Sequence, residues 1–282
     1  MKTIAIPAIL AAGMLLLLAC GCTGTPGTPP PDACPDARTH VGMLTLLTDL
    51  QGIVTGELGD LDAAAAGAAR DLGAAGLSGP AADAILDALL GENGVVRTAI
   101  VISRNGTVSA ARPDSAAGLI GTDLSYQPFV AGTFATRQPV LTGFVPLAEG
   151  GFAGLLEYPV FDDAGRMIGI VSLSFQPADL IGPRAEEMVK DTPFTIMVMQ
   201  PDGVILYDPD PGEIGRNTLT DPLYAGFPEI QEIAWRASGN WSGSGSYRFA
   251  GTGSQTIVEK ETFWTTIGIH GSEWRLFITR TI

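Results

Sequence analysis

The sequence predicts an α+β protein in which one long N-terminal helix precedes two related antiparallel-sheet modules. Three observations carry this prediction. Apolar residues recur at intervals of three or four between Met43 and Leu72, which is the spacing of one helix face. Residues 151–175 form two apolar runs joined by a polar turn at residues 162–165, as in a hairpin. A strand–turn–strand pattern occurs twice, in residues 98–121 and 195–215, which indicates a duplication.

The first 35 residues lie outside this predicted fold. Residues 1–19 contain a lysine and a short apolar run, which is typical of a signal peptide. The sequence Leu-Leu-Ala-Cys at residues 17–20 resembles the lipobox of prokaryotic lipoproteins, which implies cleavage before Cys20 and a lipid on its thiol. An uncleaved signal anchor is the alternative. Residues 20–35, rich in Gly, Thr and Pro, predict a disordered tether at the outer face of the cytoplasmic membrane.

The few cysteines and histidines give little support for catalysis or metal binding. Cys22 and Cys34 both lie in the tether, where export permits a disulfide within or between chains, or free thiols. The chain has no CxxC pair or Cys/His cluster with metal spacing. His40 and His270 are its only histidines, so a Ser-His-Asp or Cys-His constellation is hard to assemble. We expect no enzyme activity, no catalytic residues, no metal and no cofactor.

Residues 36–95 predict a long helix and a short one. The long helix starts near Asp36, and a series of glycines ends it from Gly73 onward. Residues 80–90 predict the second helix, with a proline in its first turn.

Each copy of the repeat predicts two strands, a helix and three strands. The first module covers residues 96–190, with its helix near residues 126–136, a strand at 139–144 and a helical linker at 177–190. The second covers residues 191–282, with its helix at 221–237. This order predicts a small antiparallel sheet with helices beside it in each copy.

Side chains on the last strand of the first module should alternate between the two faces of its sheet. The face expected to pack on the long helix consists of Met167, Val171, Leu173 and Phe175. The other face consists of Ile168, Ile170, Ser172 and Ser174. The two serines on it either line a cavity or meet solvent.

The formal net charge of −14 argues against nucleic acid or an anionic membrane surface as a partner. Both of these partners require clusters of Lys and Arg, which the sequence lacks.

The order of elements resembles the double Cache domain, an extracytoplasmic sensor region with PAS-like modules found in many prokaryotic receptors. The resemblance covers residues 38–282. The motifs that carry it are Asn105-Gly106, residues 120–125, residues 158–162 with Gly165 and 168–171, and in the second copy Asp202-Gly203, 208–210 and 214–217. They are strand and turn patterns.

The resemblance implies that the membrane-distal first module holds a small ligand between its sheet and the loop and helix over it. Family members that bind amino acids carry an Arg at the start of this helix and an Asp on the last strand. In this sequence Gln127 stands at the position of the Arg, and Ser172 or Ser174 stands near the position of the Asp. We therefore expect a neutral or weakly polar ligand rather than a standard amino acid.

The candidate ligand-binding residues are aromatic and polar side chains around the expected pocket, with one nearby cation. They are Arg112, Tyr126, Gln127, Phe129, Phe144, Tyr158, Ser172 and Ser174. The alternative for Phe129, Phe144 and Tyr158 is an ordinary place in the core.

The last predicted strand, residues 273–282, has no apolar span after it. We therefore expect a lipid-anchored protein that binds a small molecule outside the membrane and presents the bound state to a separate membrane receptor or transporter. The alternative is a structural module without a small ligand, which forms a homodimer through the long helix with Cys34 at its base.

Overall fold

The computed structural model describes residues 35–148, 150–251, 254 and 256–282. The predicted signal peptide, the lipidation site Cys20, Cys22, Cys34 and the tether up to residue 34 therefore lie outside the described residues, whereas Pro35, predicted as the tether's last residue, begins a helix. None of the helices in the described part is long and apolar enough to cross a membrane.

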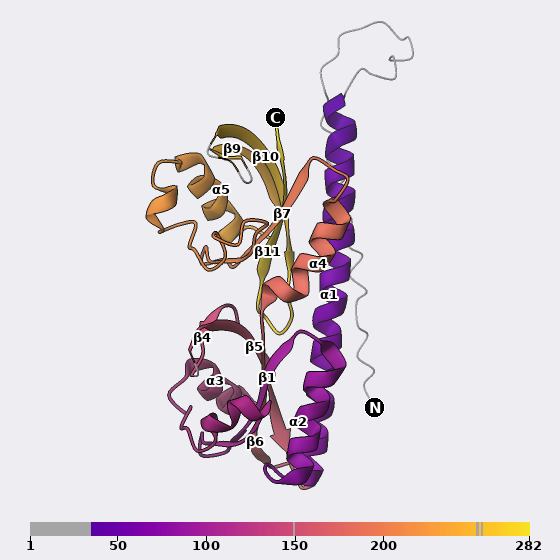
Figure 1. The fold of residues 1–282 in the computed structure, drawn as a ribbon, viewed down its shortest axis with the longest axis vertical. Helices are drawn as coiled ribbons and strands as arrows, with labels where there is room; N and C mark the ends of the chain where they lie inside the picture. The colour runs from indigo at the N-terminus through magenta and orange to yellow at the C-terminus, as the bar shows by residue number, and fades with distance from the viewer. Residues whose placement is uncertain (1–34, 149, 252–253, 255) are drawn as a thin grey trace, which may run out of the picture.

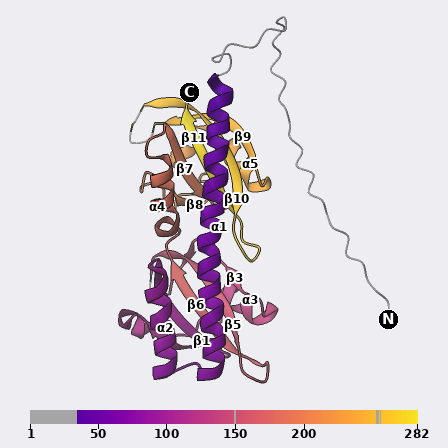
Figure 2. The same cartoon turned by 90° about the vertical axis from the view of Figure 1, so that its right-hand side faces the viewer.

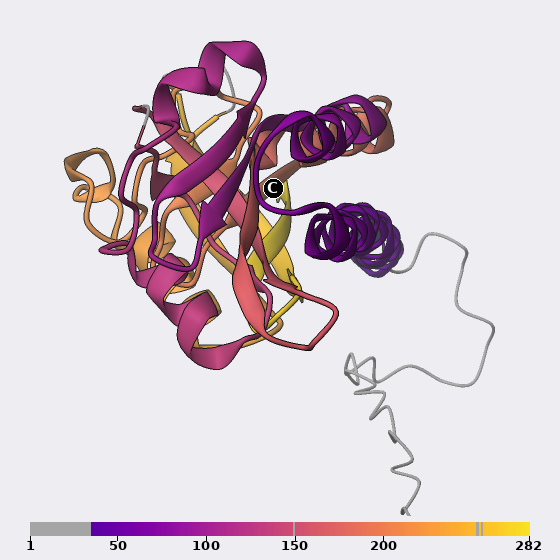
Figure 3. The same cartoon turned by 90° about the horizontal axis from the view of Figure 1, so that it is seen from below.

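Two helices begin the described chain. Helix α1 spans Pro35–Ala75, and its C-terminus is closed by Gly76 at φ 95°, a left-handed conformation that glycine adopts without strain. Helix α2 spans Pro80–Asn93 and has a proline in its first turn. Figure 3 shows the two helices side by side against one face of the first sheet.

The first sheet contains six strands. They are β1 (Val96–Ser103), β2 (Val108–Arg112), β3 (Val140–Leu141), β4 (Val145–Pro146), β5 (Phe152–Phe161) and β6 (Met167–Phe175). The main path runs β2-β1-β6-β5-β3, and β4 also pairs with β5. The predicted strand at residues 139–144 is shorter than expected because pairing breaks at Gly143, where the Phe144 N–H donates to Gln200 Oε1 at 2.6 Å.

The second sheet repeats this topology. Its strands are β7 (Phe194–Met199), β8 (Ile205–Tyr207), β9 (Gly243–Ala250), β10 (Ile257–Ile267) and β11 (Trp274–Thr281). Their order is β8-β7-β11-β10-β9, in which each strand takes the place of its counterpart in the first sheet. All pairs in both sheets are antiparallel. The predicted α+β fold with a long N-terminal helix and two sheet modules is confirmed.

Helices cover both faces of the two sheets (Figure 1). Helix α1 runs along one face of both sheets, as Figure 2 shows, and α4 (Pro177–Val189) packs beside it. The opposite faces carry the 3-10 helix η1 (Asp114–Leu119) and α3 (Pro128–Thr136) in the first module. In the second they carry η2 (Pro222–Tyr224) and α5 (Pro228–Gly239). The helix predicted at 221–237 is thus two pieces, because the residue before Pro228 avoids the helical conformation.

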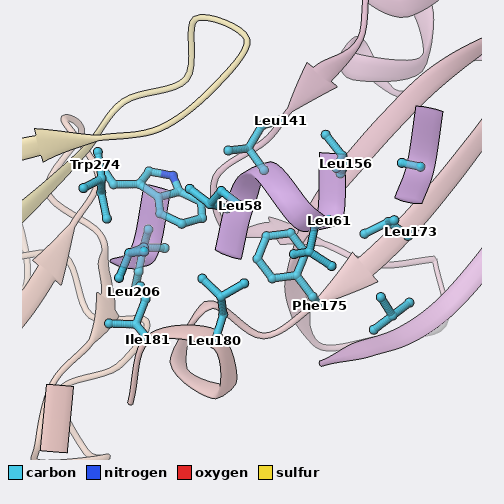
Figure 4. Packing of buried hydrophobic residues seen from close by; sticks show 14 of the residues in the cluster. Leu58, Leu61, Leu141, Leu156, Leu173, Phe175, Leu180, Ile181, Leu206 and Trp274 are labelled. Carbon is cyan, nitrogen blue, oxygen red and sulfur yellow. The ribbon is translucent and has the colours of Figure 1, made fainter. Parts of the chain in front are cut away.

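The largest core lies between α1 and the two sheets. Its helix face consists of Met43, Leu47, Leu50, Val54, Leu58, Leu61, Ala65, Ala68, Ala69 and Leu72. Where the modules meet, Phe175 of β6 and Trp274 of β11 pack with ring centroids 6.4 Å apart, beside Leu58 and Leu61 (Figure 4). One continuous core therefore joins both modules to the helix.

The predicted faces of β6 are correct except at the strand's start. Val171, Leu173 and Phe175 join the core with α1. Met167 instead packs on the far side with Ile170, and Ile168 packs toward the helix core. A bulge in the pairing of β5 with β6 causes this difference. The register shifts at the bulge, so the side chains before it point to the opposite faces from those that regular alternation predicts.

Two glycines of α1 provide a matched pair of mutations. A Cβ at Gly59 would meet no atom within 4 Å, whereas a Cβ at Gly73 would collide with the backbone oxygen of Phe161 on β5. We expect Gly59→Ala to raise the free energy of unfolding by about 1 kcal/mol, the usual helix-propensity gain. Gly73→Ala should lower it by about 1–3 kcal/mol, because backbone must move. Urea denaturation of both variants measures the difference; equal effects would contradict this close contact.

Candidate ligand-binding site

A small cavity of about 30 Å³ lies on the face of the first sheet that is turned away from α1. This volume has room for roughly two water molecules. The sheet forms the floor of the cavity, and the segments around η1, α3 and β4 form its cover.

Cross-strand pairing sets the floor. Ser172 of β6 lies between Ile100 of β1 and Glu157 of β5, and Ser174 lies in the next row beside Leu155. Because residues two apart on a strand share a face, both rows point into the same cavity. The floor therefore combines hydroxyl groups and one carboxyl group with apolar side chains.

The cover is largely apolar. Phe129 lies in the first turn of α3, directly after Gln127 and Pro128. Leu147 approaches from the segment after β4. Gln127 supplies a polar amide at the cavity's edge. Such a mixture of apolar walls and few polar groups is typical of small-molecule sites.

Glu157 is fully buried in the strand that forms this floor. Its Oε2 accepts a hydrogen bond from the Thr133 hydroxyl of α3 at 2.8 Å. Its Oε1 and the nearby Ser174 hydroxyl have no hydrogen-bond partner among the described residues. Burial raises the pKa of Glu157 to about 7, although the Thr133 hydrogen bond opposes this shift.

Glu157 is the only charged side chain among the described residues that line the cavity. A buried carboxylate with a free oxygen favours a ligand that brings a positive charge or a hydrogen-bond donor. Among the described residues that line the cavity there is no Lys or Arg that could hold an anion.

Half of the predicted site residues line this cavity: Gln127, Phe129, Ser172 and Ser174. Their contact with a ligand remains a prediction. Tyr126 does not line it, because its side chain is 72% exposed on the outside of the turn before α3.

Arg112 also lies elsewhere. It sits at the end of the edge strand β2 and forms ion pairs with Asp83 at 2.8 Å and Asp87 at 3.2 Å on α2. The expectation that it supplies a cation near the pocket is wrong, because it fastens the sheet edge to α2.

Tyr158 and Phe144 are likewise displaced from the expected pocket. Tyr158 follows Glu157 on β5 and so points to the opposite face, where its hydroxyl donates to Asp62 Oδ1 of α1 at 2.6 Å. Phe144 stacks on Phe152 with ring centroids 6.1 Å apart and packs against the central core. Tyr158 and Phe144 therefore have structural roles away from the cavity, which agrees with the alternative prediction that they belong to the core.

Sequence reasoning missed Glu157. The signal is a lone carboxylate in the apolar run Phe152–Phe161. Burying a carboxylate in such a strand is costly unless a partner or a ligand binds it. The last strand of the module, β6, carries serines and no Asp, as the sequence indicates, but the neighbouring strand β5 supplies a carboxylate opposite Ser172.

Comparison with known proteins identifies the fold. Residues 56–177 match the family model of the HK/GC/chemotaxis protein-like sensor domain. The fold is that of Cache-type sensor domains. The chain is 33% identical to an extracellular ligand-binding receptor from Desulfohalobium retbaense, with a TM-score of 0.72 over 85% of this chain. The chain spans 40% of that receptor's length. A search of curated proteins finds no match.

Two chemoreceptor domains share the fold of this Cache-type domain at lower identity. The amino-acid chemoreceptor PctB of Pseudomonas aeruginosa, solved with L-Gln, is 15% identical with a TM-score of 0.59, covering 85% of this chain and 89% of its own. The chemoreceptor CtaA of Pseudomonas fluorescens, solved with L-alanine, is 15% identical with a TM-score of 0.61, covering 87% and 97%. Because both are only 15% identical to this chain, these two matches concern the fold alone.

Proposed function

We propose that the first module senses a small organic amine outside the cytoplasmic membrane. The observation that carries this proposal is Glu157, a buried carboxyl group whose Oε1 has no partner among the described residues. An ammonium group placed between Oε1 and the Ser174 hydroxyl would satisfy both groups at once.

The cavity favours an amine over a standard amino acid. The α-carboxylate of an amino acid needs a cation or several donors, and only the neutral amide of Gln127 is near the described helix start. Apolar walls formed by Ile100, Leu124 and Phe129 suit the carbon skeleton of an amine. The sequence predicts a neutral or weakly polar ligand, whereas the buried carboxyl group of Glu157 favours a cationic one.

The pH dependence of amine binding tests this function. With a pKa of about 7 for Glu157, the ionised fraction rises from about one tenth at pH 6 to about nine tenths at pH 8. An amine that stays protonated over this range should therefore bind about tenfold more tightly at pH 8 than at pH 6. Isothermal titration calorimetry with methylamine and other short alkylamines, the size that a cavity of about 30 Å³ admits, measures this ratio.

Two variants separate the site from general charge effects. Glu157→Gln should abolish binding and its pH dependence, whereas Glu187→Gln on α4, whose side chain is 81% exposed, should change neither. Affinity that rises toward pH 6, or that survives in Glu157→Gln, would overturn the proposal.

We propose further that the domain is lipid-anchored through Cys20 and presents its bound state to a separate membrane receptor or transporter. The N-terminus of α1 and the C-terminus of the described chain lie at the same end of the molecule, beside the second module (Figure 1). A membrane attachment there would leave the first module distal. Labelling cells with a radioactive fatty acid, with Cys20→Ala as control, tests the anchor; equal labelling of both proteins would exclude it.

A homodimer through α1 is a second candidate function. Val41 and Leu44 lie three residues apart on one side of α1, and they are large apolar side chains that are 64% and 45% exposed. A paired helix from a second copy would bury them. Light scattering on the wild type and on Val41→Glu/Leu44→Glu would show a dimer that the substitutions dissociate; a monomeric wild type would remove this candidate.

A further inference from the structure

A second, larger cavity lies in the second module, on the corresponding face of its sheet. Its volume is about 290 Å³, at the lower end of the range for small-molecule sites. The sheet, the segment after β8, η2 and the end of β9 enclose it. Aromatic walls come from Tyr224, Tyr247 and Phe249.

Lys260 of β10 brings a cation into this cavity. The residue is 9% exposed, and its ammonium group lies 5.9 Å from the ring centroid of Phe249. No carboxylate of the described chain forms an ion pair with it, and burial lowers its pKa. A buried ammonium group held only by an aromatic face and by distant charges lacks the close partner that such groups usually have.

A carboxylate lies in the same cavity at a distance from this cation. Asp208 follows β8 and interacts electrostatically with Lys260 without direct contact. Its Oδ1 accepts a hydrogen bond from the Asp210 N–H at 2.8 Å. Burial raises the pKa of Asp208 to about 7. The nearby Glu213 adds negative charge and accepts a hydrogen bond from the Tyr224 hydroxyl.

Thr218 provides an independent indication that the cavity holds a polar ligand. Its side chain is 2% exposed and lines the cavity, and its Oγ1 has no hydrogen-bond partner among the described residues. Leaving a buried hydroxyl unpaired is costly, so the arrangement favours a molecule that completes it.

We propose that this second cavity binds a small zwitterion, with the ligand carboxylate on Lys260 and the ligand ammonium group on Asp208. One molecule with both charges spans the gap that the two side chains leave between them and neutralises each. The site differs from the first in kind. Strands β5 and β10 take the same place, the fourth, in their two sheets. Strand β5 places the acid Glu157 in the first cavity, and β10 places the base Lys260 in the second.

Calorimetry in a Glu157→Gln background tests this site without a contribution from the first cavity. The probes are glycine, L-alanine and γ-aminobutyrate as zwitterions, with acetate and methylamine as ligands of single charge. At least one zwitterion should bind with one-site stoichiometry and more tightly than acetate or methylamine. Lys260→Met should weaken this binding roughly 10- to 100-fold, and Thr218→Val should weaken it by a smaller factor.

Further variants control for charge and folding. Lys190→Met, at a side chain that is 66% exposed, should leave the affinity unchanged, and Lys260→Arg should retain part of it. Circular dichroism shows which variants are folded. If Lys260→Met does not fold, the affinity of Thr218→Val tests the site instead. The proposal is overturned if no zwitterion binds, if acetate or methylamine binds equally well, or if neither Thr218→Val nor Lys260→Met changes the affinity. Because the background lacks Glu157, failure here leaves the amine site of the first module unaffected.

Discussion

Glu157→Gln is expected to raise the free energy of unfolding at pH 8 by roughly 3 kcal/mol while it removes the response to amines. Glu157 is fully buried and has a pKa of about 7, against 4.5 for an ordinary glutamate. The folded protein therefore holds this proton more tightly than the unfolded chain does. Ionising the group in the folded state costs stability, and glutamine, which has no charge, avoids that cost.

The sign of the pH dependence follows from the same comparison. Between about pH 4.5 and pH 7 the folded state binds more protons at Glu157 than the unfolded state, so this residue lowers stability as the pH rises. Below pH 4.5 both states carry the proton, and the wild type and Glu157→Gln should have similar stability. The difference should appear through this window and be complete above pH 7.

Urea denaturation at pH 4 and pH 8 measures the two differences. Thr133→Val is a matched second variant, because it removes the hydrogen bond that favours the charged carboxyl group. It should destabilise the protein more at pH 8 than at pH 4. A difference between wild type and Glu157→Gln that is independent of pH would contradict the raised pKa. A stabilised variant that no longer binds amines would show that the site is kept at a cost in stability.

The fold was predictable because its signals are local and periodic. The spacing of apolar residues in α1 and the alternation in β5 and β6 reflect which faces are buried. The duplication was visible because each copy repeats the same turns in the same order. The exceptions are places where pairing or backbone geometry departs from regularity, such as the bulge at Met167 and the break before Pro228.

The site was harder to predict because it depends on register between strands. Ser172 and Ser174 share a face by alternation alone, and both line the cavity. That Glu157 joins them requires knowing that it pairs with Ser172, which the sequence of either strand does not specify. Tyr158 was chosen for its aromatic ring, but one residue along a strand reverses the direction of a side chain. In the second module, Lys260 is placed by the same kind of pairing, opposite Tyr247 of β9.

Trp274→Ala should lower the free energy of unfolding by about 3–5 kcal/mol, the usual cost of removing a large aromatic side chain from a core. Trp274 is 1% exposed and packs against Phe175 in the cluster that joins α1, β6 and β11 (Figure 4). Its loss leaves a cavity at the junction of the two modules. Trp241→Ala is the matched control, because Trp241 is 72% exposed, and it should change stability by no more than about 0.5 kcal/mol.

Trp274→Phe distinguishes lost packing from a lost polar contact. The indole Nε1 of Trp274 is buried and has no hydrogen-bond partner among the described residues, so phenylalanine removes volume together with an unsatisfied donor. Its cost should therefore be well below that of Trp274→Ala. Differential scanning calorimetry of the three variants measures these costs. If Trp274→Phe destabilises as much as Trp274→Ala, the indole N–H has a bonded partner and the junction is held by more than apolar packing.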